Sequence, residues 1–193
     1  DIPWNRCVST NEYPQSIELR INTEFKRDHT LISTQGWELN LLQGTGSLGA
    51  LEFKTLVGTS TTDFFPIFDD EYTQVVINRS LVGDNEVYDI YGKEGFNERI
   101  RNEGYTQLLV PTGSSIWNYP TDLDLGSGFS GSMDEFRLWT APLDESRIVN
   151  HTLLPDAIDG NHVSSSTEDL VLRLDFEYPK DRNLDPMIKN VSI

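Results

Sequence analysis

Hydrophobic and polar residues alternate in several short stretches of this chain. In Ser16–Asn22 the three aliphatic residues at alternate positions share one face, and Glu18 and Arg20 share the other. This period of two is typical of a β-strand with one face in the core and the other in solvent. The same pattern predicts further strands at Thr30–Ser33, Trp37–Leu42, Leu51–Leu56, Tyr72–Arg79, Glu86–Tyr91, Tyr105–Val110 and Leu170–Phe176.

The segment SMDEFRLW alternates in the same way. Its phase puts Asp134, Phe136 and Leu138 on one face and Glu135 and Arg137 on the other. We therefore expect the first three to face the interior and the last two to face solvent. A carboxylate on the interior face is costly unless it is hydrogen-bonded. Asp134 is thus expected to accept backbone N–H groups of a neighbouring loop or to ligate a metal ion.

A short helix is predicted directly after this strand. Pro142 cannot continue a central strand, and Asp144 is of a residue type preferred at a helix N-cap. Leu143 and Ile148 then occupy the N′ and N4 positions of a hydrophobic staple. The helix is expected over Asp144–Val149.

Short strands separated by turns, without any βαβ alternation, predict an all-β fold. We expect an antiparallel two-sheet β-sandwich of the jelly-roll type with one short helix. The last strand, Leu170–Phe176, either pairs with the first strand and closes this sandwich or opens a further repeat. Closure is favoured, because it leaves no exposed edge. Gly44–Gly49 fits G-x-G-x-x-G, but a strand follows it, so a tight turn is favoured over a nucleotide site.

A resemblance to a known family rests on the pattern G-x-hydrophobic-D-E-hydrophobic-R-hydrophobic-W followed by A-x-L-D-E-x-x-I. The chain matches it at Gly131, Met133–Trp139, Ala141, Leu143–Glu145 and Ile148. The pattern resembles the end of a laminin G-like domain of the concanavalin A-like lectin and glucanase superfamily. With the NHT after the helix and the later LVLRLDFE, the ensemble is similar to repeats in large structural proteins of tailed bacteriophages.

The resemblance covers most of the chain and implies a division into three parts. A lead-in segment spans 1–15, a laminin G-like jelly-roll sandwich spans 16–177, and 178–193 is a C-terminal extension or the start of a further domain. The first residue is Asp rather than Met, which indicates a processed chain or a part of a longer one.

Charge narrows the choice of partners. The chain has 31 acidic against 15 basic residues, for a net charge of −16. Such a surface repels nucleic-acid backbones and anionic membranes, so we expect no nucleic-acid partner. No apolar run approaches the ~20 residues that span a bilayer, so no membrane insertion is expected. The single cysteine, Cys7, excludes an internal disulfide and a thiolate zinc cluster.

Acidic loop residues make calcium the candidate cofactor. Asp122 and Asp124 stand at alternate positions before the SMDEFRLW strand, where the resemblance to calcium-binding relatives places ligands, and Asp134 begins that strand. Calcium takes six to eight oxygen ligands, so other loops would have to contribute. The competing interpretation is that these carboxylates are solvated or hydrogen-bonded within the fold.

Trp117, Asn118 and Tyr119 form the candidate contact site for a glycan or a protein partner. Aromatic rings beside small polar residues suit a stacking platform, but they equally suit a cover for one end of the sandwich. The three histidines have no metal-ligand spacing and are expected at the surface or in loops.

Two carboxylates aimed at one bond would indicate a glycosidase. Asp134 and Glu135 are adjacent and are expected to project to opposite faces of the strand, which argues against that chemistry. Asp175 and Glu177 share a face and are expected to meet solvent. We therefore expect no enzymatic activity, and a glycan-cleaving enzyme is kept as a third hypothesis only.

The leading hypothesis, which follows from the resemblance, is a non-catalytic structural or adhesion module of a bacteriophage virion protein. Its place would be a tail, fibre or surface appendage, and its partners other virion proteins, a host-surface glycan or further copies of itself. The alternative is a carbohydrate-binding lectin module, with or without calcium, of a secreted or cell-surface protein.

Overall fold

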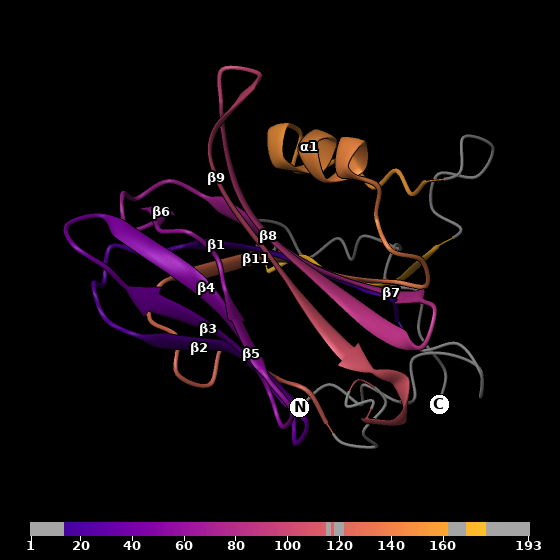
Figure 1. Ribbon diagram of the computed structural model, residues 1–193. Coiled ribbons are helices and arrows are strands. Elements are labelled where there is room, and N and C mark those ends of the chain that lie inside the picture. The colour runs from indigo at the N-terminus through magenta and orange to yellow at the C-terminus, as the bar shows by residue number, and fades with distance from the viewer. Residues whose placement is uncertain (1–13, 115–116, 118–121, 162–168, 177–193) are drawn as a thin grey trace.

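The computed structural model describes residues 14–114, 117, 122–161 and 169–176. Their strands form two antiparallel sheets that pack face to face, so the fold is a jelly-roll β-sandwich (Figure 1). One sheet has the strand order β12-β11-β1-β7-β8-β9. The other has the order β10-β2-β3-β4-β5, with β6 paired to β4. The elements are β1 (Ser16–Asn22), β2 (His29–Ser33), β3 (Trp37–Gln43), β4 (Leu48–Thr55), β5 (Thr59–Thr61), β6 (Phe65–Pro66), β7 (Thr73–Val82), β8 (Asn85–Phe96), β9 (Arg99–Pro111), η2 (Thr112–Ser114), β10 (Asp124–Leu125), β11 (Ser132–Trp139), α1 (Glu145–Leu153) and β12 (Leu170–Leu174).

The predicted strands are present, and two of them are much longer than expected. β8 and β9 continue to a two-residue turn at Asn97 and Glu98, whose φ angles of 48° and 61° suit a tight hairpin. This hairpin rises beyond the sandwich beside α1 (Figure 1). The glycine-rich stretch before β4 is a turn, as predicted, with Gly46 at φ 70°.

The core lies between the two sheets. The alternate aliphatic residues of β1, namely Ile17, Leu19 and Ile21, are buried there with Phe136 and Leu138 of β11. They pack against Leu31, Leu39, Leu41, Leu51 and Phe53 of the facing sheet. The alternation of period two therefore identified the inward face of β1 correctly.

A β-bulge in β11 changes the direction of two predicted side chains. Glu18 pairs with Arg137 and Arg20 with Asp134, so one residue of β1 stands opposite two of β11. Glu135 is the additional residue of the bulge, and its φ angle is 51°. Asp134 consequently lies on the same face as Arg20, opposite to Phe136. The prediction that Asp134 shares the inward face is wrong, because strict alternation fails at the bulge.

Part of the outer face of the β1-containing sheet is covered by the helix. α1 lies across β7, β8 and β9 (Figure 1). Beneath it, Val76, Trp139, Leu143 and Ile148 form a second, smaller apolar cluster. Asp144 is the N-cap residue and Leu143 and Ile148 are both buried, as predicted, although the Asp144 side chain makes no capping hydrogen bond. The helix extends to Leu153, beyond the predicted end at Val149.

The last described strand joins this sheet through an unexpected neighbour. β12 pairs antiparallel with β11, from Phe136 opposite Leu174 to Trp139 opposite Leu170. The expected partner was the first strand, β1, but β11 occupies that edge of β1.

No helix in the described part of the chain has the length and apolar character that crossing a bilayer requires.

Candidate functional site

The predicted contact residue Trp117 belongs to the core and not to the surface. Its side chain is 0% exposed and stacks on Trp37, with ring centroids 5.1 Å apart and an interplanar angle of 12°. Its indole Nε1 donates a hydrogen bond of 2.6 Å to the carbonyl oxygen of Pro14. Trp117 therefore offers no platform to an external ligand, and this part of the prediction is wrong. Asn118 and Tyr119 lie outside the described residues.

The three predicted calcium ligands do not come together. Asp122 and Asp124 are exposed, and Asp124 pairs with Ser33 in the sheet that contains β2. Asp134 belongs to the other sheet, where it faces Arg20. Its Oδ1 accepts the backbone N–H of the next residue, Glu135, at 2.9 Å. The prediction that these three carboxylates form one calcium site is therefore wrong.

A different acidic cluster is present at the bulge. The carboxylate oxygens of Asp134, Glu135 and Asp175 lie within 4.8 Å of one another. The expectation that Asp134 and Glu135 project to opposite faces is therefore wrong. Glu135 itself is buried, because it points toward the guanidinium groups of Arg137 and Arg173 and not into solvent.

Arg137 and Arg173 hold both oxygens of Glu135. Arg137 donates to Oε2 from Nε at 2.9 Å and from Nη2 at 2.7 Å, and Arg173 donates to Oε2 from Nε at 2.8 Å and to Oε1 from Nη2. Desolvation raises the pKa of Glu135, but the hydrogen bonds and charges of the two arginines outweigh it, so the pKa lies below its ordinary value. A carboxyl group that stays ionised suits an ion pair and not the general acid of a glycosidase.

The cluster fits a calcium ion poorly. Calcium needs carboxylate oxygens that are free to turn toward it, and those of Glu135 are already committed to guanidinium groups. The Arg173 pKa is raised, chiefly by its hydrogen bond to Glu135, which indicates a strong pair. Arg20 adds a third positive charge opposite Asp134. The described residues therefore build an ion-pair network at this bulge.

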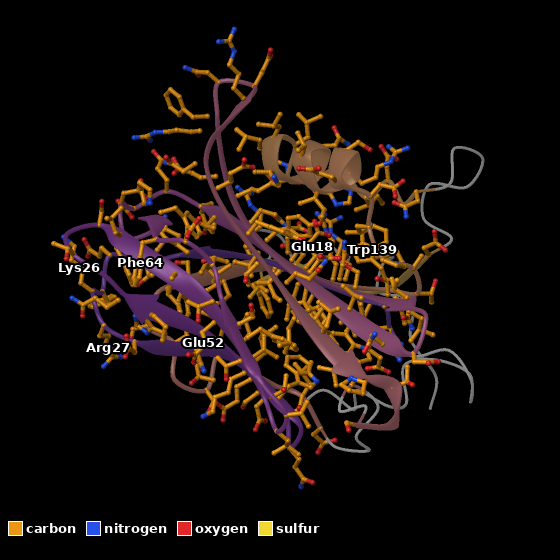
Figure 2. The ribbon with its side chains drawn as sticks, in the orientation of Figure 1. Glu18, Lys26, Arg27, Glu52, Phe64 and Trp139 are labelled. Carbon is orange, nitrogen blue, oxygen red and sulfur yellow. The ribbon has the colours of Figure 1, made fainter. Side chains whose placement is uncertain are left out.

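Glu18 is the centre of this charged layer. It was expected to face solvent, but it is 0% exposed. Its Oε1 accepts from Gln74 Nε2 at 2.7 Å and lies 2.8 Å from His151 Nδ1, and its Oε2 accepts from Trp139 Nε1 at 3.0 Å. Arg137 Nη1 lies 3.5 Å from Oε2. Figure 2 shows Glu18 and Trp139 close together below the helix.

The burial of Glu18, Arg137 and His151 corrects the expectation that they meet solvent. The side chains satisfy one another, and the chain after α1 completes them: Arg137 donates to the carbonyl oxygens of Ala157, at 2.9 Å, and of Pro155. His151 Nε2 lies 3.1 Å from the Asp159 carbonyl oxygen. His29 is also buried, and His162 lies outside the described residues. This layer binds α1 to the sheet and leaves no exposed group for chemistry at its centre.

A group of polar and aromatic side chains, two of them exposed and two partly buried, lies on the same outer face of the sheet, on β8 and β9. It consists of Asp89, Tyr91, Tyr105 and Gln107, which we call the tyrosine surface. Asp89 stands opposite Gln107, and Tyr91 stands opposite Tyr105. Tyr91 also packs against the apolar cluster beneath α1, whereas Tyr105 is 49% exposed.

Hydrogen bonds fix the geometry of the tyrosine surface. Tyr105 Oη donates to Asp89 Oδ1 at 2.6 Å, and Gln107 Nε2 donates to the same oxygen at 2.8 Å. The two tyrosine rings lie 5.0 Å apart with a tilt of 40°, and Lys93 Nζ lies 5.7 Å from the Tyr91 ring centroid. The four side chains form an ordered aromatic and polar patch that suits contact with a ligand.

Both phenols stay protonated well beyond neutral pH. Desolvation, and then the Asp89 carboxylate, raise the pKa of Tyr91 to about 12. Desolvation and the hydrogen bond to Asp89 raise the pKa of Tyr105 further. Neutral Tyr105 is the hydrogen-bond donor that the Asp89 carboxylate requires.

We expect the free energy of unfolding to fall with pH in the alkaline range. Between the unfolded tyrosine pKa of about 10 and the raised folded values, only the unfolded chain releases phenolic protons, so rising pH favours unfolding. The measurement is urea unfolding at pH 8, 10 and 11. Tyr91→Phe should lose less stability over that range than the unsubstituted chain, and an equal loss would contradict the prediction.

The tyrosine surface was missed from the sequence. Asp89 and Tyr91 alternate in a predicted strand, and Tyr105 and Gln107 alternate in another. The signal would have been the hairpin that joins them, because its register sets the pairs opposite one another. The strand predicted at Glu86–Tyr91 ends before the hairpin, so the pairing with the second strand is not visible in the sequence pattern.

The chain was compared with protein-family models, curated proteins and solved structures. No family model matches the chain, and no curated protein matches it. Among solved structures, the chain is similar to the native heptameric SAP-like pentraxin from Limulus polyphemus. The two share 12% sequence identity with a TM-score of 0.45, over 87% of this chain and 88% of that chain.

Proposed function

We propose that this chain is a non-catalytic contact module of a bacteriophage virion protein, in a tail, fibre or surface appendage. The observation that supports contact is the tyrosine surface, an exposed aromatic and polar patch held by hydrogen bonds on paired strands. The virion setting is supported by the sequence pattern around Gly131–Ile148 and its resemblance to phage structural repeats.

The arrangement of charges is consistent with a scaffold for contact. The buried ionisable groups between the sheet and the segment of α1 and its following loop have partners within the fold; they are Glu18, Glu135, Arg137 and His151. They therefore hold the helix and the sheet together. The groups that remain available to a partner lie on exposed strand and loop surfaces, such as β9.

Two measurements on phage particles test this function. Mass spectrometry of purified virions should detect peptides of this chain, and antibodies against it should label a tail or an appendage in electron micrographs. A chain that is found only in the secreted or cell-surface fraction of its source would overturn the virion setting. That result would favour the alternative, a lectin module of a secreted or cell-surface protein.

We expect millimolar calcium to leave the melting temperature unchanged, because arginines occupy the carboxylates at the bulge. The measurement is thermal unfolding with calcium and with EDTA. Arg173→Ala serves as the matched variant, since it frees one side of Glu135. A calcium-dependent rise in the unsubstituted chain that Asp134→Asn abolishes would contradict the prediction and favour the calcium-dependent lectin.

A further inference from the structure

We infer that the tyrosine surface binds an arginine side chain from an extended basic segment of a neighbouring protein. This partner class rests on the proposed contact function and gives the chemistry of the contact. Three features of the surface support it. They are an excess of carboxylates, an exposed aromatic ring beside one of them, and a row of exposed side chains along β9.

Carboxylates outnumber cations at this surface. Glu103 and Glu145 share the ammonium group of Lys93, at 2.6 Å and 3.4 Å, and their side chains are 60% and 69% exposed. Both carboxylates can therefore also reach a partner. Asp89 has no ion pair among the described residues, since its Oδ1 accepts from two neutral side chains. Three negative charges against one positive charge attract a cationic side chain.

The surface already holds one cation in this way. Lys93 Nζ lies 5.7 Å from the centroid of the Tyr91 ring and is bound by two carboxylates. Tyr105 and Asp89 repeat this pairing of a ring with a carboxylate, because the Tyr105 hydroxyl donates to Asp89 Oδ1 at 2.6 Å. The Tyr105 ring is 49% exposed, and no cation from the described residues lies over it. A positive group over a tyrosine face is attracted by the ring, and the adjacent carboxylate adds to that attraction.

Arginine fits the surface better than lysine does. Asp89 Oδ2 and Gln107 Oε1, two oxygens near the Tyr105 hydroxyl, accept no hydrogen bond from the described residues. A guanidinium group is flat and carries five N–H donors, so it can stack on the ring and donate to both oxygens at once. An ammonium group is a compact point charge and is more strongly hydrated. We therefore expect arginine to bind more tightly than lysine.

The row of side chains on β9 suits an extended segment. Tyr105, Gln107 and Leu109 alternate along β9, which is the edge strand of its sheet. Leu109 is 56% exposed. Alternate residues of a strand lie about 7 Å apart, so the tyrosine and the leucine are about 14 Å apart in one row. An extended partner segment with an arginine and an apolar residue four positions apart matches this spacing.

The test is an NMR titration with the end-blocked peptide TTRTTTVTT, in which an arginine and a valine are four positions apart. The peptide should shift the amide signals of residues 89, 91, 105 and 107. The same peptide with lysine in place of arginine should bind more weakly. Peptides with glutamate or with citrulline, the neutral isostere of arginine, should produce no shift at the same concentration. Binding should weaken when NaCl is raised from about 50 mM to about 500 mM, because salt screens exposed charges.

Substitutions separate this surface from the general acidity of the chain. Asp89→Asn keeps a hydrogen-bond acceptor but removes the charge, and it should weaken binding about fivefold. Glu24→Gln removes one negative charge from the exposed loop between β1 and β2, which also carries Lys26 and Arg27, labelled in Figure 2. It should leave binding unchanged. Tyr105→Leu should weaken binding about threefold to fivefold, whereas Tyr105→Phe keeps the ring and should bind at nearly full strength. The melting temperature of each variant checks its folding.

Three results would overturn the inference. Equal binding of the arginine and citrulline peptides would show that the positive charge is not recognised. Equal weakening by Asp89→Asn and Glu24→Gln would show that the peptide responds only to the net charge of the chain. Self-association in sedimentation velocity that Asp89→Asn abolishes, without any peptide-induced shift, would identify a second copy of the chain as the occupant.

Failure of the inference is distinguishable from failure of the proposed function. A chain that is found in virions but gives no peptide-induced shift at the tyrosine surface would overturn the arginine assignment and keep the virion setting. Peptide binding by a chain that is absent from virions would support the assignment and overturn the virion setting.

Discussion

Replacing Glu18 by alanine is expected to destabilise the fold by about 3–5 kcal/mol, the range for removing one partner of a buried ionic network. Glu18 is fully buried and accepts hydrogen bonds from Gln74 and Trp139. Without it, the positive charge of Arg137 loses one of its two carboxylate neighbours inside the protein. The measurement is the free energy of unfolding from urea denaturation.

A matched control and a double substitution make this prediction specific. Glu52, labelled in Figure 2 on β4, is only partly buried and accepts one hydrogen bond, from Asn40 at 3.2 Å. Glu52→Ala should cost less than about 1 kcal/mol. Glu18→Met combined with Arg137→Met should cost less than the sum of the single changes, because it removes both charges together. Additive losses would contradict the network.

The sequence was sufficient for the fold because alternation marks the face that enters the core. Ile17, Leu19 and Ile21 of β1 are all buried, as their spacing predicts. The assumption that the opposite face meets water was the source of the largest errors. Glu18 and Arg137 are as buried as the aliphatic residues, because α1 and the segment that follows it cover them and their charges are paired. The pattern of hydrophobic and polar positions gives the polarity of each side chain, but it does not show which other side chain will pair with it.

Two other errors have local physical causes. The bulge places Glu135, a non-glycine residue, at positive φ, so the sequence has no glycine to mark it, and it reverses the direction of Asp134. Trp117 stands in a polar loop, but its ring fits against Trp37 within the core. Both depend on contacts between segments distant in the sequence. The tyrosine surface was missed for the same reason, since it exists only through the register of β8 with β9.

The packing beneath that surface couples stability to the proposed contact. Gly92 of β8 stands opposite Gly104 of β9, next to Tyr91 and Tyr105. A Cβ on Gly92 would lie 2.5 Å from Phe65 Cζ, and a Cβ on Gly104 would lie 2.5 Å from Phe65 Cδ1. The two glycines therefore make room for the Phe65 ring, which reaches across from β6 of the facing sheet. The Phe65 ring thus packs against β8 and β9 on the inner face, directly behind the tyrosine surface.

Phe65→Ala is accordingly expected to cost about 3–5 kcal/mol, the range for removing a buried phenylalanine ring. Gly104→Ala should cost about 1–3 kcal/mol through overpacking, whereas Gly113→Ala, whose Cβ would meet nothing within 4 Å, should cost little. Urea unfolding measures each change. In Phe65→Ala combined with Gly104→Ala the clash is gone, so the added methyl group should restore part of the lost stability. A double variant as unstable as the sum of the two single losses would show that the glycines do not accommodate the ring.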